Sequence, residues 1–81
     1  MRPDGVAPAT WRVVLSDWYN QSLTVTITLK SGQTFTGKVK GHPAHWLHDM
    51  ATLETGYPSL GERHVVYNID LNEVAAVTAS T

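Results

Sequence analysis

The chain has 81 residues, no cysteine, and six Lys and Arg against seven Asp and Glu, which gives a formal net charge of −1. A chain of this length has room for one small domain, and such domains often depend on oligomerisation, metals or disulfides for stability. The lack of cysteine excludes disulfides and thiolate metal sites. The near-neutral charge argues against a protein that grips duplex DNA through many phosphates, although it is compatible with a local basic patch.

The first nine residues contain Pro3, Gly5 and Pro8 and show no hydrophobic periodicity, which predicts a flexible tail before a single domain over residues 10–81. The first ten residues lack the apolar run of a signal peptide, and no segment has the length and hydrophobicity of a transmembrane helix. We therefore expect a soluble cytoplasmic protein that does not associate with membranes.

An amphipathic helix is predicted after this tail. Its apolar stripe has the spacing i, i+3, i+4 and i+7 and consists of Trp11, Val14, Leu15 and Trp18. Thr10 is the expected N-cap, and Asn20 is the expected end of the helix. We expect the two tryptophans to lie across the open end of a small sheet.

Residues 23–41 predict a long antiparallel hairpin, because apolar and polar residues alternate strictly in its first half. A three-residue loop ending at Gly32 would pair Ile27 with Phe35 and Val25 with Gly37. Both apolar stripes then share a face, and Gly32 occupies the position where such loops need a left-handed residue. The opposite face of the hairpin carries threonine and lysine.

Three further strands are expected, at about residues 50–55, 64–71 and 74–78. Gly41 and Pro43 mark a loop after the hairpin, with room for one helical turn. One helix followed by five short strands predicts a mostly β protein in which a strongly bent sheet closes into a small barrel. Gly37 and Gly41 would help the second strand to bend.

This order of elements resembles the Sm-like superfamily, which includes the LSm and Hfq-like proteins. Residues 25–41 resemble its Sm1 motif, with the Ser31-Gly32 turn followed by Phe35 and Gly37. Residues 65–77 are similar to its bacterial Sm2 motif, with Val66-Tyr67 followed by Leu71 and Val74. The resemblance implies a five-stranded SH3-like barrel with an N-terminal helix. It also implies RNA binding and a cyclic homo-oligomer in which strand four of one subunit pairs with strand five of the next.

One departure from the family pattern bears on function. The bacterial motif has a basic residue and a histidine directly after its tyrosine, and these bind uridine-rich RNA at the pore. This chain has Asn68 and Ile69 in those places. Asn68 is able to hydrogen-bond a base, whereas Ile69 cannot replace a histidine.

The exposed face of the predicted hairpin carries Lys30, Lys38 and Lys40, and Trp46 follows in the next loop. Basic side chains beside an aromatic ring are the combination that binds single-stranded nucleic acid. We expect nucleic-acid binding by five residues: Lys38, Lys40 and Trp46 at the rim of the ring, and Tyr67 and Asn68 at its pore. The alternative is an ordinary solvated strand face whose lysines discourage aggregation.

The loop after the hairpin contains His42, His45 and His48, with Asp49 adjoining. Imidazole and carboxylate groups are suitable zinc ligands, so a metal site would use His45, His48 and Asp49. We expect an exposed polar loop without metal instead, because a loop rich in Gly and Pro does not ensure the geometry of a closed site. No nucleophile and base stand at motif spacing, so we expect neither an enzyme nor a cofactor.

The sequence therefore leads to two hypotheses. The first is a ring-forming Sm-like protein that binds RNA or other single-stranded nucleic acid. The second is a structural or adaptor ring with protein partners, of the kind found in phage or mobile-element assemblies. The absence of a Lys-His pair after Tyr67 favours the second hypothesis, and the resemblance of fold favours the first.

Overall fold

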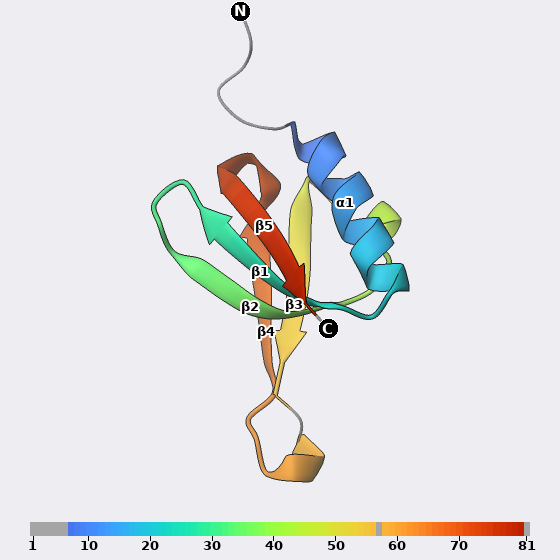
Figure 1. Ribbon diagram of the computed structural model, residues 1–81, viewed down its shortest axis with the longest axis vertical. Coiled ribbons are helices and arrows are strands. Elements are labelled where there is room, and N and C mark those ends of the chain that lie inside the picture. The colour runs from blue at the N-terminus through green and yellow to red at the C-terminus, as the bar shows by residue number, and fades with distance from the viewer. Residues whose placement is uncertain (1–6, 57, 81) are drawn as a thin grey trace, which may run out of the picture.

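The computed structural model describes residues 7–56 and 58–80, which form one helix and a single five-stranded sheet (Figure 1). The helix and strands are α1 Pro8–Asn20, β1 Thr24–Leu29, β2 Thr34–Val39, β3 Met50–Thr55, β4 Val65–Asp70 and β5 Val74–Ser80. Short 3₁₀ turns occupy η1 Pro43–His45, η2 Pro58–Leu60 and η3 Leu71–Glu73. All pairings are antiparallel, in the strand order β4-β3-β2-β1-β5. The predicted mostly β class, with five strands and an N-terminal helix, is confirmed.

The β1–β2 hairpin has the predicted register. Ile27 lies opposite Phe35, and Val25 lies opposite Gly37. The loop closes through a 2.8 Å hydrogen bond from the Leu29 amide to the carbonyl of Gln33. Gly32 has a φ of +93°, the left-handed conformation that the three-residue loop requires.

The start of the helix differs from the prediction. α1 begins at Pro8, so residues 8 and 9 of the expected tail are helical, and Thr10 lies inside the helix rather than at its N-cap. The cap is Ala7, which has extended backbone angles and no side-chain capping bond. The proline ring fixes φ near the helical value and lacks an amide hydrogen, so proline suits the first turn of a helix. Residues 1–6 of the expected tail lie outside the described residues.

The remaining elements lie close to their predicted positions. β3 has the predicted bounds, and the loop before it contains the expected helical turn at Pro43–His45. β4 is one residue shorter at each end than expected, and β5 continues to Ser80 instead of ending at residue 78. The longer β5 follows from its partner, because Ser80 still lies opposite Thr24 at the start of β1.

The core lies between the inner face of the bent sheet and α1, which crosses one end of the barrel (Figure 1). Its buried side chains are Trp11, Leu15, Val25, Ile27, Val39, Ala51, Leu53, Ile69, Leu71 and Val74. Trp18 is partly buried and packs against this cluster, so both tryptophans of the helix contribute to the core as expected. Phe35 of β2 and Tyr67 of β4 pack with ring centroids 5.0 Å apart and so bridge two strands that are not neighbours in the sheet.

The connection between β3 and β4 projects from the barrel as a narrow stalk with η2 at its tip (Figure 1). At its base Gly56 has a φ of +88° and lies directly against the main chain of Arg63. Among the described residues, α1 is too short and too polar to cross a bilayer.

Candidate functional site

Two of the predicted binding residues, Lys40 and Asn68, belong to one row of side chains across β2, β3 and β4. The Lys40 amide donates to the carbonyl of Thr52 at 2.9 Å, which continues the β2–β3 ladder beyond Val39. Thr52 lies opposite Asn68, and its hydroxyl donates to the Asn68 side-chain oxygen at 3.2 Å. Because side chains alternate between the faces of a strand, these three residues share the outer face of the barrel.

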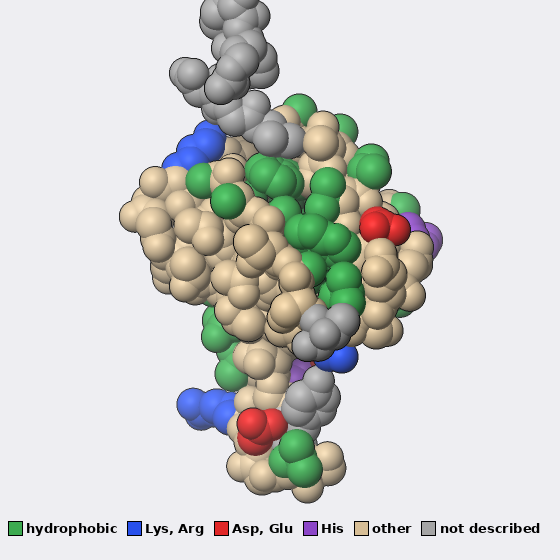
Figure 2. All heavy atoms as spheres, in the orientation of Figure 1, with side chains coloured by type: hydrophobic (Ala, Val, Ile, Leu, Met, Phe, Trp, Pro, Cys, Tyr) green, Lys and Arg blue, Asp and Glu red, His purple; other side chains and the backbone are tan. Residues whose placement is uncertain are grey.

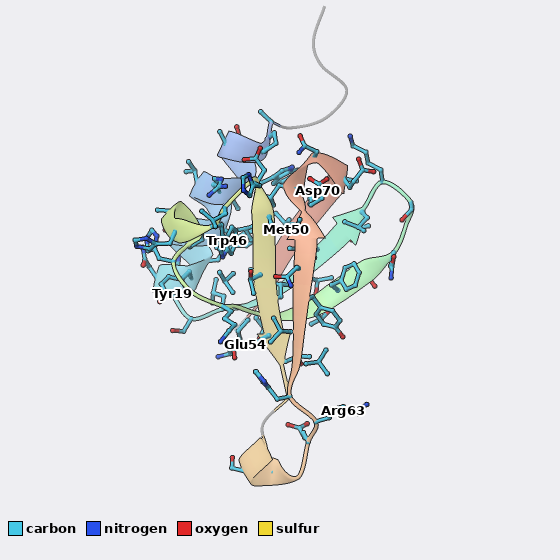
Figure 3. All side chains as sticks on the ribbon, turned by 180° about the vertical axis from the view of Figure 1, so that it is seen from behind. Tyr19, Trp46, Met50, Glu54, Arg63 and Asp70 are labelled. Atoms are coloured by element: carbon cyan, nitrogen blue, oxygen red, sulfur yellow. The ribbon has the colours of Figure 1, made fainter. Side chains whose placement is uncertain are left out.

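Trp46 lies beside this row. Its indole Nε1 donates a 3.2 Å hydrogen bond to the main-chain carbonyl of Lys40. The ring is half-buried and packs against the core, so the turn η1 and the indole hydrogen bond together fix its position. Figure 3, in which β3 and β4 face the viewer, shows Trp46 on the α1 side of β3. A partly exposed aromatic ring therefore stands next to the Lys40 backbone.

Lys38 belongs to the neighbouring row on the same face, but a carbonyl group and a carboxylate near it partly offset its positive charge. Its ammonium group donates to the carbonyl of Ser22 at 3.2 Å, and Lys38 lies opposite Glu54 on β3. The Glu54 carboxylate is 3.0 Å from the Nε2 atom of His64. Lys38 is therefore half-buried and held by Ser22, whereas Lys40 is exposed and is the freer cation of the two.

Tyr67 is not part of this surface. It precedes Asn68 on β4, so its side chain lies on the inner face of the strand, where it is half-buried against Phe35. The structure thus gathers Lys38, Lys40, Trp46 and Asn68 on or beside one outer face and places Tyr67 within the barrel. Its predicted contact with RNA at the pore of a ring stays a prediction.

The far end of the β3–β4 face is acidic. Asp70 lies opposite Met50, and its carboxylate accepts hydrogen bonds from the Asn72 amide at 2.9 Å and from the Asn72 side chain at 3.0 Å. The backbone hydrogen bond from Asn72 lowers the pKa of Asp70 below its ordinary value of 3.8, helped by the Asn72 side chain and by Lys30. This carboxylate is therefore ionised at neutral pH and would repel phosphate near it.

A cluster of rings borders the face on the other side, where the loop meets the last turn of α1. The ring centroids of Tyr19 and His42 are 5.6 Å apart, and those of His42 and His45 are 6.0 Å apart, both in edge-to-face geometry. Sequence reasoning had singled out the histidines but not Tyr19. The signal available in the sequence was an aromatic residue off the apolar stripe of the helix. The structure shows that its ring is exposed.

Arg12 of α1 holds this loop in place. Its guanidinium donates to the carbonyl of Pro43 at 2.7 Å and lies 3.5 Å from the Asp49 carboxylate. His48 and Asp49 both have a φ of +54°, a conformation that is uncommon outside glycine. The Asp49 carbonyl also accepts a 2.9 Å bond from the Leu71 amide, so contacts on both sides stabilise the strained segment.

The metal-binding alternative gains no support from this arrangement. Asp49 is directed to Arg12, and the described part of the chain contains no group of three or more His, Asp or Glu side chains able to hold a metal ion. The structure therefore does not gather His45, His48 and Asp49 into a ligand set.

The two end strands of the sheet leave their outer edges unpaired. β4 pairs only with β3 and β5 pairs only with β1 within the described chain. Figure 2 shows hydrophobic side chains gathered in a band between β5 and α1. On these two elements Val77 and Ala79 of β5 and Trp18 of α1 are only partly buried against the core. An apolar strip thus runs beside an open strand edge.

Comparisons of the chain with protein-family models, with curated proteins and with solved structures found no match.

Proposed function

We propose that this protein is an Sm-like ring subunit that binds RNA or other single-stranded nucleic acid on the outer face of β2, β3 and β4. The observation that carries the proposal is the hydrogen bond from Trp46 to the carbonyl of Lys40. It fixes an aromatic ring beside the backbone of an exposed lysine, so that a base is able to stack on the ring while its phosphate meets the lysine side chain. Asn68, in the same row as Lys40, adds an amide that is able to hydrogen-bond a base edge.

The proposed assembly uses the two open edges. An exposed strand edge presents unpaired amides and carbonyls, and a second chain that pairs with it satisfies them. When β4 of one copy adds to β5 of the next, the contact is head-to-tail, and such a contact forms a ring where the rotation closes. The same contact would cover part of the apolar band beside β5 (Figure 2). A domain this small gains stability from burying such a surface.

A second candidate function is a structural or adaptor ring that has protein partners and binds no nucleic acid. Its specific support is the acidic character of the same face, where Glu54 lies opposite Lys38 and Asp70 lies opposite Met50. The replacement of the bacterial Lys-His pair by Asn68 and Ile69 points the same way. We place it second because neither carboxylate lies in the Lys40–Thr52–Asn68 row, and Trp46 lies beside that row.

In this proposal the protein acts in the cytoplasm and carries out no catalysis. Its partners are RNA and further copies of the same chain, which assemble through β4 and β5. Neither the ring nor the nucleic-acid surface requires a metal or an organic cofactor.

Fluorescence anisotropy with labelled U-rich, A-rich and mixed oligonucleotides at two salt concentrations tests the binding. We expect salt-dependent binding tighter than about 100 micromolar, the weak limit typical of non-specific nucleic-acid affinity. Trp46→Leu removes the aromatic ring and should weaken binding about tenfold, since stacking contributes about 1–3 kcal/mol per base. A wild-type protein that is folded and assembled but binds no oligonucleotide would favour the adaptor ring.

A further inference from the structure

A tight turn with an uncommon backbone conformation leads into β3, beside the proposed binding face. The Met50 amide donates a 3.0 Å hydrogen bond to the carbonyl of Leu47, which closes a four-residue turn. The two central residues, His48 and Asp49, both have a φ of +54°. Positive φ at both central positions is typical of a type I′ turn, in which glycine, asparagine and aspartate predominate. A histidine in the first of these positions is strained, so other contacts must hold the turn in place.

Contacts from two other elements hold this turn. Arg12 of α1 donates to the Pro43 carbonyl and lies 3.5 Å from the Asp49 carboxylate. The Leu71 amide donates to the Asp49 carbonyl at 2.9 Å. Strained backbone that the surrounding structure maintains is concentrated at binding sites. The side chains that this turn presents are therefore candidates for contact with a ligand.

The turn presents two apolar side chains to solvent. Leu47 and Met50 are its first and last residues, and in a two-residue hairpin such residues face each other on one side of the chain. Leu47 is 73% exposed and Met50 is 38% exposed. Met50 stands two residues before Thr52 on β3, so it belongs to the same outer face. An apolar pair thus borders the row that contains Lys40, Thr52 and Asn68.

Trp46 adjoins this pair. Its Nε1 hydrogen bond to the Lys40 carbonyl places the indole at the end of the β2–β3 ladder, where the Lys40 amide meets the Thr52 carbonyl. Figure 3 shows Trp46 and Met50 near the start of β3. Single apolar side chains on a surface are ordinary, whereas a contiguous group of them indicates an interaction site. Trp46, Leu47 and Met50 are called the apolar platform below.

The charges at the two ends of the apolar platform have opposite signs. Lys40 is exposed at one end. Asp70 lies opposite Met50 at the other end and accepts two hydrogen bonds from Asn72. A phosphate is therefore attracted to the Lys40 end and repelled from the Met50 end. The uncharged base of a nucleotide suits the platform better than its phosphate does.

The other charges near the apolar platform have partners. Arg12 lies against Asp49. One row away, Lys38 lies opposite Glu54 and donates to a main-chain carbonyl. Lys30 of the β1–β2 loop acts on Asp70, but less than the hydrogen bonds from Asn72 do. Lys40 and Asp70 are therefore the two charges that orient a ligand on the platform.

We propose that the apolar platform stacks a base of a bound single strand, with the adjoining phosphate at Lys40. This inference rests on the proposed function, and it assigns Leu47 and Met50 as further binding residues of the same surface. Stacking and apolar contact are available to every base, so the platform tolerates many sequences. The Met50 thioether suits this role because sulfur makes favourable contacts with aromatic rings.

The experiment compares two labelled single strands of DNA of equal length by fluorescence anisotropy. One has a mixed sequence, and the other carries abasic tetrahydrofuran units throughout, so it keeps the phosphates and lacks the bases. The wild type should bind the mixed strand more tightly. Leu47→Ser should weaken binding of the mixed strand about fivefold, the lower end of the effect of removing a stacking side chain. It should leave the affinity for the abasic strand unchanged, and Met50→Thr should act in the same way.

Leu60→Ser is the matched control, because Leu60 at the tip of the stalk is 74% exposed and lies outside the apolar platform. It should bind both strands as the wild type does. Urea unfolding checks that each variant is folded. The proposal is overturned by a Leu47→Ser protein that binds the mixed strand as the wild type does or loses the same factor on both strands. A Leu60→Ser protein with an equal loss would also overturn it.

The two proposals fail in different ways. Wild-type protein that binds the mixed and the abasic strand equally well would overturn the stacking of a base and leave binding of the nucleic-acid backbone in place. Folded wild-type protein that binds neither strand would overturn both proposals.

Discussion

Gly37 of β2 lies so close to the main chain of β3 that a Cβ atom on it would be 2.5 Å from the carbonyl oxygen of Glu54. The contact occurs where β2 changes partner. Residues 34–37 of β2 pair with β1 alone, Lys38 pairs with both β1 and β3, and Val39 pairs with β3. A strand that bends between two neighbours brings their backbones together, and glycine leaves room for that approach. The close approach of β2 to β3 therefore depends on the absence of a side chain at this position.

We predict that Gly37→Ala destabilises the protein. The added methyl group meets backbone rather than the end of a flexible side chain, so the strands must separate, at a cost of about 1–3 kcal/mol. Urea unfolding followed by tryptophan fluorescence measures this change. Thr36→Ala, on the exposed neighbouring position of the same strand, is the control and should cost less. A Gly37→Ala protein as stable as the wild type would show that the bend does not require glycine.

Arg12 should stabilise the loop through its geometry and not only through its charge. Lysine at this position keeps the charge but cannot contact the Pro43 carbonyl and the Asp49 carboxylate together. We expect Arg12→Lys to lower the free energy of unfolding by about 1 kcal/mol, the value of one hydrogen bond. Hydrogen exchange should also become faster at amides of residues 44–50.

The control for this prediction is Arg63→Lys, since Arg63 is exposed on the stalk (Figure 3). Unchanged exchange in the loop of the Arg12→Lys protein would mean that other contacts hold the segment at His48 and Asp49 in its left-handed conformation.

Asp70 should contribute to stability in a pH-dependent way. Hydrogen bonds from Asn72 lower the pKa of its carboxyl group below 3.8 in the folded protein. A lowered folded-state pKa means that the folded protein binds the proton less readily than the unfolded chain does. The contribution is therefore fully present above the unfolded pKa, near 3.8, and is lost as the pH falls through the folded-state value.

Urea unfolding of Asp70→Ala and wild-type protein across pH 2.5 to 6 checks this prediction. Above about pH 5 the variant should have a lower free energy of unfolding than the wild type. This difference in the free energy of unfolding should shrink as the solution becomes more acidic. A difference that grows as the pH falls has the wrong sign for a carboxylate stabilised in its charged form.

Lys40 and Lys30 provide a matched pair for the nucleic-acid surface. Lys40 is exposed beside Trp46, whereas Lys30 lies in the β1–β2 loop near Asp70. Lys40→Gln should lower the affinity for a single-stranded oligonucleotide by about fivefold at 0.1 M salt and reduce the salt slope by about 0.7. Lys30→Gln should change neither quantity. Equal losses in the two variants would indicate attraction by overall charge instead of a surface at Lys40.

Much of this fold could be predicted from local sequence patterns. Apolar and polar residues alternate along β1 and β2, and the loop between them needs a left-handed residue at Gly32. Only one register meets both conditions and places the two apolar stripes on one face, and the structure has that register. The predicted start of α1 is wrong because Pro8 has two meanings in a sequence: proline is frequent in flexible tails, and it is also common in the first turn of a helix.

The site was less predictable, because it depends on contacts between distant segments. Period-two alternation already placed Tyr67 and Asn68 on opposite faces, yet the motif had grouped them in one pore site. Nothing in the sequence indicated that the Trp46 indole would bond to Lys40, or that Arg12 would reach across to Pro43. Tertiary hydrogen bonds of this kind follow from the packing of the loop against α1, which local spacing does not encode.

The proposed nucleic-acid surface and the self-association both require a ring built through β4 and β5. Multi-angle light scattering of the purified protein at tens of micromolar measures the mass of that assembly. We expect a single species of several chains, together with dissociation in Val66→Lys, which adds a charge to the exposed side of β4. Leu60→Lys, which adds the same charge at the tip of the stalk, should leave that species intact. A wild-type protein with the mass of one 8.9 kDa chain would show that no ring forms.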